Sequence, residues 1–188
     1  MTENTCTITI DGKTVELPVV EGTTGDRAID ISRLRDLTGV TTLDPSLANT
    51  ASCRSAISWI DGENGRLLYR GIPIETLAEN KVSFVETAML LITGRLPTPA
   101  ERNAFSELLA RNSALHRNMD LHFNAFPPNS HPMAIMSAMI NAMSTHDRPK
   151  ITDEDSAIRN SAKLMSRVRT IAAASYKASV GEPAIYPR

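Results

Sequence analysis

Residues 52–78 read S-C-R-S-A-I-S-W-I-D-G-E-N-G-R-L-L-Y-R-G-I-P-I-E-T-L-A, and this stretch decides the fold. Two short β-type runs flank the polar link at 61–65, whose two glycines allow the positive φ angles of a tight loop. Pro73 then suits the first position of a helix, and the apolar residues that follow it share one helical face. The stretch therefore predicts a β-hairpin that leads directly into a helix.

The sequence before this stretch also favours β-structure. Residues 7–10 and 14–17 alternate between polar and apolar side chains around an Asp-Gly pair, which is the pattern of a second hairpin. A short helical pattern follows at 28–37 and ends at Gly39. We therefore expect a small β-rich domain over residues 1–70.

The sequence after residue 70 changes to helical patterns. Ser83 with Glu86, and Thr98 with Glu101, are two capping boxes that predict helix starts. Further helices are predicted at 115–126, 133–144 and 153–179. The predicted fold class is mainly α, with a small N-terminal β-rich segment followed by a helical bundle over 71–188.

Two of these helices carry faces suited to helix–helix packing. The helix at 133–144 is apolar on nearly every side, so neighbours must cover it all round. We expect it to meet a partner helix across a two-fold interface, with candidate contact residues Met133, Ser137, Ala138 and Met143. In the last helix, small and medium residues recur at three- and four-residue steps, at Ala157, Ser161, Leu164, Val168, Ile171, Ser175 and Ala178.

The composition is that of a globular protein. Of the 188 residues, 41% are hydrophobic and 22% are charged, and the formal net charge of −1 gives no bulk attraction to nucleic acid or to an anionic membrane. There is no apolar run long enough to span a bilayer and no basic start typical of a signal peptide. Cys6 and Cys53 lie far apart, which argues against a disulfide framework or a zinc site. We expect a cytoplasmic protein with reduced thiols.

The four histidines do not suggest a catalytic or metal site. His116 and His122 are six residues apart, about 240° round a helix, so they cannot share a metal from one helix. His146 follows a helix end and is expected to be solvated. His131 precedes a helix start, where a ring nitrogen can bond to the backbone. The sequence predicts no metal ligands, and phosphate-binding loops are absent.

A basic stripe is the stronger candidate for a binding site. Arg159, Lys163 and Arg167 recur at four-residue steps and so share one helical face. Such a stripe is most often a solvated face, and the alternative is an anion site. The spacing alone leaves both interpretations open.

The pattern I-x-W-I-D-G-x-x-G-x-L-x-Y-R-G-x-P-I-x-x-L-A within residues 52–78 closely resembles the N-terminal signature of citrate synthases. Within that family the chain is similar to the bacterial type that carries an extra N-terminal β-rich segment. The resemblance covers essentially the whole chain, with further matches at 122–136 and 176–188. It implies the condensation of acetyl-CoA with oxaloacetate and water to citrate and CoA, in the tricarboxylic acid cycle. Both are substrates, and the resemblance implies no metal or redox cofactor.

The resemblance also implies an allosteric site. Similar enzymes bind NADH with basic residues that match Lys163 and Arg167, together with a segment matching 111–114, which begins at Arg111. The chain departs from the family pattern at three contact positions, which here are Asn112, Ala114 and Thr145. These residues lack the ring and sulfur contacts of the family, so we expect NADH inhibition to be weak or absent.

The histidine-bearing motifs of the family, H-G-G-A-N and G-F-G-H, are missing from residues 1–188. We therefore assign no catalytic and no cofactor-binding residue, and expect the catalytic residues beyond Arg188. The expected partner is the remainder of the same enzyme, in a homodimer or hexamer. Two alternatives stay open, namely part of a 2-methylcitrate synthase, or a non-catalytic helical partner or regulatory subunit of a split enzyme.

Overall fold

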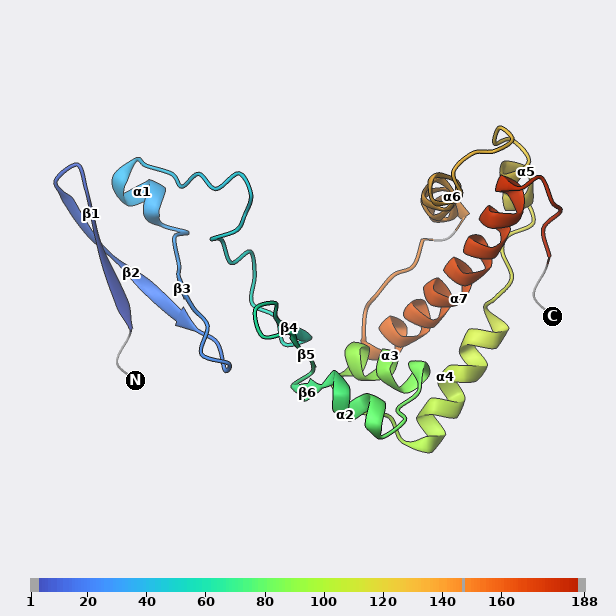
Figure 1. The fold of residues 1–188 in the computed structure, drawn as a ribbon, viewed down its shortest axis with the longest axis horizontal. Helices are drawn as coiled ribbons and strands as arrows, with labels where there is room; N and C mark the ends of the chain where they lie inside the picture. Colours follow the sequence, from blue (N-terminus) through green and yellow to red (C-terminus); the bar gives the residue numbers. More distant parts are fainter. Residues whose placement is uncertain (1–3, 147, 186–188) are drawn as a thin grey trace. The chain divides into compact units, whose positions relative to one another are not determined.

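The computed structural model describes residues 4–146 and 148–185, which form two compact units (Figure 1). The first unit extends to Ala56 and the second begins at Ile57. The chain thus divides before the central hairpin, whereas the change from β-type to helical sequence patterns predicted a boundary after it, at residue 70. The hairpin belongs to the second unit because its last strand continues into that unit's first helix. Residues 186–188, which end the motif at 176–188, lie outside the described residues.

The first unit is a three-stranded antiparallel sheet with one short helix. Strands β1 (Thr5–Ile10) and β2 (Lys13–Glu21) pair in the register Ile10 opposite Lys13, so that only two residues form the loop. These residues, Asp11 and Gly12, have φ angles of 50° and 79°, as the tight turn between two strands requires. The predicted N-terminal hairpin is confirmed.

The segment 28–37 is only partly helical, contrary to prediction. Strand β3 (Arg27–Ile29) pairs with β2, with Ala28 opposite Val20, and this pairing holds the first part extended. Helix α1 is limited to Leu34–Thr38, and Gly39 ends it as predicted, with a φ of 80°. A backbone ladder to β2 therefore overrides the helical pattern in the first part of this segment.

The second unit opens with the predicted central hairpin. Strands β4 (Ser58–Asp61), β5 (Arg66–Tyr69) and β6 (Ile72–Pro73) form a sheet in the order β4-β5-β6. The Asp61 carboxylate accepts hydrogen bonds from the Asn64 backbone N–H at 3.1 Å and from the Asn64 side chain at 2.7 Å, which closes the loop. Helix α2 (Ile74–Glu79) follows Pro73 directly.

Arg70 fixes the turn between β5 and β6 to the next helix. Its backbone has a φ of 51°, a left-handed conformation, and Gly71 follows with a φ of 83°. The Arg70 guanidinium donates from Nε and Nη2 to the Leu91 carbonyl oxygen, at 3.2 and 2.6 Å. Leu91 lies near the end of α3 (Phe84–Thr93), where helix carbonyls have no partner within the helix. One side chain thus links the hairpin to α3.

The two predicted capping boxes are present. Ser83 caps α3 and Thr98 caps α4 (Pro99–Arg111), each exchanging hydrogen bonds with the glutamate three residues later. Gly94 ends α3 with a φ of 84°, and its N–H donates to the Leu90 carbonyl. These starts and ends follow the sequence closely because capping depends on residues only a few positions apart.

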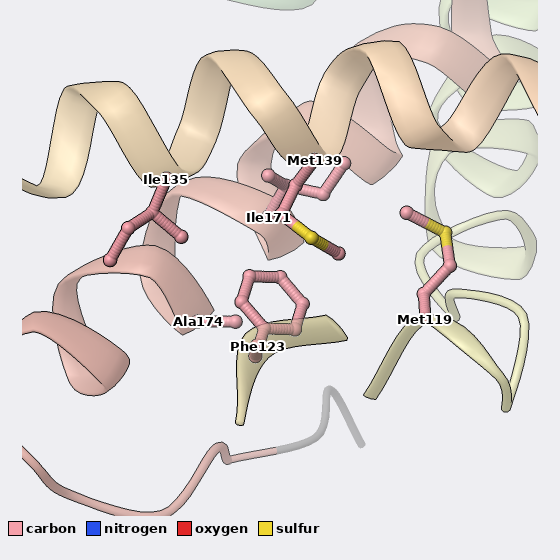
Figure 2. Close-up of a cluster of buried hydrophobic side chains, with 6 residues drawn as sticks. All are labelled: Met119, Phe123, Ile135, Met139, Ile171 and Ala174. Carbon is pink, nitrogen blue, oxygen red and sulfur yellow. The ribbon is translucent and has the colours of Figure 1, made fainter. Parts of the chain in front are cut away.

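Helix α7 (Glu154–Ser179) is the central element of the second unit (Figure 1). Its first half packs with α3 and α4 in a cluster of Met89, Phe105 and Ala162. Its second half packs with α5 (Met119–Phe123) and α6 (Pro132–His146). Figure 2 shows this second cluster, in which side chains from the three helices converge, namely Met119, Phe123, Ile135, Met139, Ile171 and Ala174.

The structure corrects two details of the helical prediction. Helix α5 is shorter than the predicted span of 115–126, and the turn before it uses the Asn118 N–H to bond the His116 ring instead of a helical carbonyl. The buried row of α7 also differs from the predicted one. Ile171 and Ser175 are buried as expected, but the Leu164 side chain is 49% exposed. Small size and recurrence alone do not show which side of a long helix its neighbours cover.

The Glu101 carboxylate gives the fold a measurable pH dependence. Hydrogen bonds from Arg95, at 2.6 and 3.0 Å, and from the Thr98 backbone and hydroxyl lower its pKa from 4.5 to about 2. Because the folded state holds the ionised form, this contribution to stability is complete above pH 4.5 and is lost as the pH falls toward 2. We expect Glu101→Gln to lower the urea midpoint at pH 7, and the difference from wild type to shrink steadily below pH 4.5.

The matched control is Glu107→Gln, which breaks a pair with Arg111 on the surface of the same helix. Because that pair is highly exposed and caps no helix, we expect a smaller change in the urea midpoint at pH 7. A Glu101→Gln difference that stayed constant from pH 7 to pH 3 would contradict the assigned role of the carboxylate.

Candidate functional site

The predicted basic stripe lies where α7 passes the end of α4. Lys163, Ser166, Arg167 and Thr170 are spaced i, i+3, i+4 and i+7, so they share one face of α7. Asp153 fixes the start of this helix, because its side chain accepts from the Ser156 N–H at 2.7 Å. The rigid helix thus sets the positions of the two basic side chains along its face.

Two hydrogen bonds join this face to the end of α4. Ser166 Oγ donates to the Leu109 carbonyl at 2.5 Å, and Thr170 Oγ1 donates to the Ser113 carbonyl at 2.7 Å. Ser166 is almost completely buried, with 2% of its surface exposed. The structure therefore brings residues 109–113 against residues 166–170, so the segment 111–114 and the helix that carries Lys163 and Arg167 lie side by side.

The position of the stripe has a structural explanation as well as a functional one. The C-terminal end of a helix carries partial negative charge on its free carbonyl groups, and cations beside it are stabilising. Lys163 and Arg167 are half-buried on the face that contacts the end of α4, whereas Arg159 is exposed. Half-buried cations at such a place complement the helix end, and the same charge would favour an anion.

The third predicted residue of this site, Arg111, makes its described contact within α4. Its guanidinium pairs with the Glu107 carboxylate at 3.0 Å, and its side chain is 77% exposed. Arg111 thus lies in the segment that contacts α7, but its side chain pairs with Glu107, one helical turn earlier in α4. Sequence spacing could not show this choice, because a pair at i, i+4 competes with any contact across the interface.

Helix α6 has two different faces. Ile135 and Met139 are buried in the cluster of Figure 2. Met133, Ser137 and Ala138, three of the predicted interface residues, are exposed in this chain. The helix therefore presents an apolar and small-residue face that is exposed within the described residues 4–146 and 148–185.

The fourth interface candidate, Met143, lies elsewhere. It packs against the cluster formed by α5, α6 and α7 within the chain and is half-buried there. The prediction treated α6 as equally apolar on all sides, so it could not separate the residues that face α7 from those that face outward. The candidate interface is reduced to the exposed face.

Three of the four histidines meet on the surface of the second unit, which the sequence did not predict. The His116 and His146 rings stack with centroids 4.5 Å apart and planes 14° apart. The His122 ring lies edge-on to His146 at 6.4 Å. The prediction missed this cluster because it compared His116 and His122 on one continuous helix, whereas His116 precedes α5 and His146 ends α6.

The fourth histidine, His131, has the structural role that the sequence predicted. Its Nδ1 accepts a hydrogen bond from the Met133 backbone N–H at 3.2 Å, at the start of α6. Among the residues that the structure describes, no group of three His, Cys, Asp or Glu side chains could hold a metal ion. In the same residues, no helix combines the length and the apolarity needed to cross a membrane.

Comparison with known proteins identifies the family. Residues 46–188 match the family model described as "Citrate synthase, C-terminal domain". The chain is 38% identical over 188 residues to two proteins named "Citrate synthase 1" from Mycobacterium tuberculosis, of strains CDC 1551 / Oshkosh and ATCC 25618 / H37Rv. The match covers 99% of this chain and 43% of each relative, so the chain spans less than half the length of these proteins.

Solved structures agree in fold. A citrate synthase from Thermotoga maritima superimposes with a TM-score of 0.64 and 33% identity, over 78% of this chain and 38% of that chain. A citrate synthase from Thermoplasma acidophilum, in a ternary complex with carboxymethyl coenzyme A and oxaloacetate, gives a TM-score of 0.73 over 79% of this chain and 39% of that chain. At 21% identity the second likeness bears on the fold alone. Since the family model covers most of the residues, the chain belongs to the citrate synthase family.

Proposed function

We propose that this chain is part of a cytoplasmic citrate synthase, which condenses acetyl-CoA with oxaloacetate and water to give citrate and CoA. The observation that carries the proposal is the family match over residues 46–188. The names of the 38% identical relatives support the same activity. One structural relative was solved with a CoA derivative and oxaloacetate bound, which fits these substrates.

The reaction defines what the rest of the enzyme must supply. A carboxylate has to remove a proton from the methyl group of acetyl-CoA, and a neutral or cationic donor has to stabilise the enol oxygen. Arginines are suited to hold the two carboxylates of oxaloacetate. These steps are acid–base chemistry, which does not require a metal or a redox cofactor. The motifs expected to carry them, H-G-G-A-N and G-F-G-H, do not occur in residues 1–188.

The role of residues 57–185 is therefore that of a scaffold. Helix α7 joins two packed clusters, and the catalytic part of the same enzyme is the proposed partner of this scaffold. Neither alternative is favoured by the comparisons, since the matched proteins are named as citrate synthases and not as 2-methylcitrate synthases or as regulatory subunits. Propionyl-CoA as the preferred substrate stays the competing outcome of the activity test.

Homo-oligomer formation through α6 is the proposed mode of assembly. Ala134, Ser137 and Ala138 lie exposed on one side of this helix beside the exposed Met133. Small side chains let two helices approach closely, and a two-fold axis would bring the same face of a second copy against this one. A dimer, or a hexamer made of dimers, would bury this face.

Nucleotide regulation is the proposed role of the basic stripe. Lys163 and Arg167 are half-buried beside the end of α4, so an anion bound there would be less screened by solvent than on an open surface. Asn112, Ala114 and Thr145 supply no aromatic ring or sulfur to a nucleotide. We therefore expect phosphate groups to dominate any binding, and NADH to inhibit weakly or not at all.

The activity test uses the enzyme that contains this chain together with its catalytic part. We expect it to release CoA only when acetyl-CoA and oxaloacetate are both present, and to use propionyl-CoA more slowly. Residues 1–188 alone, purified without the endogenous enzyme, are expected to release none, because the groups named above are missing. Thiol release followed with a chromogenic disulfide measures both. Activity of 1–188 alone, or a preference for propionyl-CoA, would contradict the proposal.

The assembly test places a charge on the exposed face of α6. In the enzyme, Ala138→Glu would bury a carboxylate between two helices, at a cost on the order of several kcal/mol. We expect dissociation to smaller species in sedimentation velocity with the helical circular dichroism retained, since residue 138 is exposed within one chain. Ala138→Ser, which is small and uncharged, is the control and should assemble normally. A Glu variant of wild-type size and stability would place the interface elsewhere.

The regulation test removes the two half-buried cations together. Lys163→Ala with Arg167→Ala should weaken any inhibition by ATP or NADH and leave the uninhibited turnover nearly unchanged. Arg169→Ala removes an exposed cation from another side of the same helix and serves as the control. Inhibition constants for ATP and NADH, measured at one fixed salt concentration, show whether the two cations contribute to binding of the inhibitor. Equal inhibition of the double variant and the control would show that the stripe is a structural feature only.

A further inference from the structure

The first unit buries very little of its apolar surface. Within its described residues, 4–56, the fully buried side chains are Leu17 of β2 and Leu34 of α1 alone. The apolar side chains of β1 are only half-buried. Units of this size are marginally stable even with a full core, and association is a common way to bury more surface. The stability of this unit is therefore expected to depend on contacts beyond residues 4–56.

Strand β1 is the unprotected edge of the sheet in this unit (Figure 1). Its residues 5–10 read T-C-T-I-T-I, with no charge and no proline, whereas natural sheet edges are usually short or carry charges that prevent pairing. The opposite edge follows this rule, since β3 has three residues and begins with Arg27. The part of β2 that β3 leaves unpaired carries Lys13 and Glu16. Only β1 lacks such protection among the described strands of this unit.

The register of the hairpin shows which backbone groups of β1 point away from β2. Ile10 and Lys13 close the two-residue loop as a hydrogen-bonded pair, and such pairs alternate along an antiparallel ladder. The hydrogen bond from the Val19 N–H to the Asn4 carbonyl, at 2.7 Å, follows the same alternation. The residues between them whose N–H and C=O groups point out of the edge are therefore Thr5, Thr7 and Thr9.

We propose that β1 pairs antiparallel with β1 of a second copy of this chain, about a two-fold axis that places Thr7 opposite Thr7. This register also places Thr5 opposite Thr9, so the outward backbone groups of all three threonines are paired. The two three-stranded sheets become one sheet of six strands in the order β3-β2-β1-β1-β2-β3. The contact is separate from the α6 face and does not rest on the proposed activity.

The side chains of the edge fit a second copy in this register. Residues directly opposite each other lie on the same face of a sheet, so Cys6 meets Ile8 of the second copy on the face that also carries Val15 and Leu17. The half-buried apolar face of one sheet thus continues into the other, and residues 5–9 bring no like charges together. A shift of one residue would place threonines opposite apolar side chains, which disfavours it.

The experiment traps this register with a disulfide. In the complete chain, Cys53→Ser removes the exposed thiol and Ile8→Cys places a new one opposite Cys6 of the second copy. The two Cα atoms of such a non-hydrogen-bonded pair are about 4.5 Å apart, which a disulfide can span. We expect mild oxidation to give a covalent dimer in non-reducing electrophoresis. Cys53→Ser with Ile10→Cys is the matched control and should stay monomeric, because its thiol lies diagonally, about 7–8 Å from Cys6 of the second copy.

A proline on the edge tests the backbone pairing itself. Thr7→Pro, added to the chain with Ile8→Cys, removes two of roughly six hydrogen bonds between the copies. The β1–β2 ladder is kept because the Thr7 N–H points away from β2. We expect at least about fivefold less covalent dimer. Thr14→Pro is the control and should cross-link normally, because it removes an N–H that points outward from β2 and not from β1.

Three results would overturn the proposal. They are no covalent dimer with Ile8→Cys, equal cross-linking of Ile8→Cys and Ile10→Cys, and an undiminished yield with Thr7→Pro in a chain whose circular dichroism matches wild type. The first of these would mean that another part of the enzyme, or none, covers the edge. The disulfide reports on this contact alone, so the result does not depend on citrate formation or on assembly through α6.

Discussion

The packing of the second unit depends on hydrogen bonds from α7 to the end of α4. The Ser166 and Thr170 hydroxyls bind the carbonyls of Leu109 and Ser113, which a helix end cannot satisfy by itself. Leaving a buried carbonyl without a partner costs about 1–3 kcal/mol. These contacts join α7 to the end of α4, beside the cluster that contains Phe105 of α4 and Ala162 of α7.

The parts of the fold that the sequence predicted are those decided within a few residues. The capping boxes at Ser83 and Thr98 and the central hairpin around Asp61 need only their own neighbours, and all of them are present. The elements that were predicted wrongly depend on contacts between residues far apart in the sequence. Residues 27–29 form a strand because β2 pairs with them, and Leu164 lies exposed on α7 although its spacing matches that of the buried Ile171.

The same distinction applies to the candidate sites, since some of their features depend on neighbouring residues and others on contacts between distant segments. The stripe containing Lys163 and Arg167 follows from helical spacing, and so does its common face with Ser166. The direction of Arg111 and the meeting of His116 with His146 do not, because each depends on which segments the tertiary structure brings side by side. The family itself was recognisable from motif residues, whereas its chemistry requires groups that residues 1–188 do not contain.

The link formed by Arg70 limits where this chain can change its length. Its guanidinium holds the Leu91 carbonyl of α3, while its own backbone and Gly71 make the sharp turn between β5 and β6. One added residue between 69 and 72 would rotate the guanidinium away from α3 and shift the pairing of Tyr69 with Ile72. The loop at 61–65 has no such anchor to a helix among its described bonds. Insertions and deletions among related proteins should therefore collect at the hairpin tip, and the four residues from Tyr69 to Ile72 should keep a constant length.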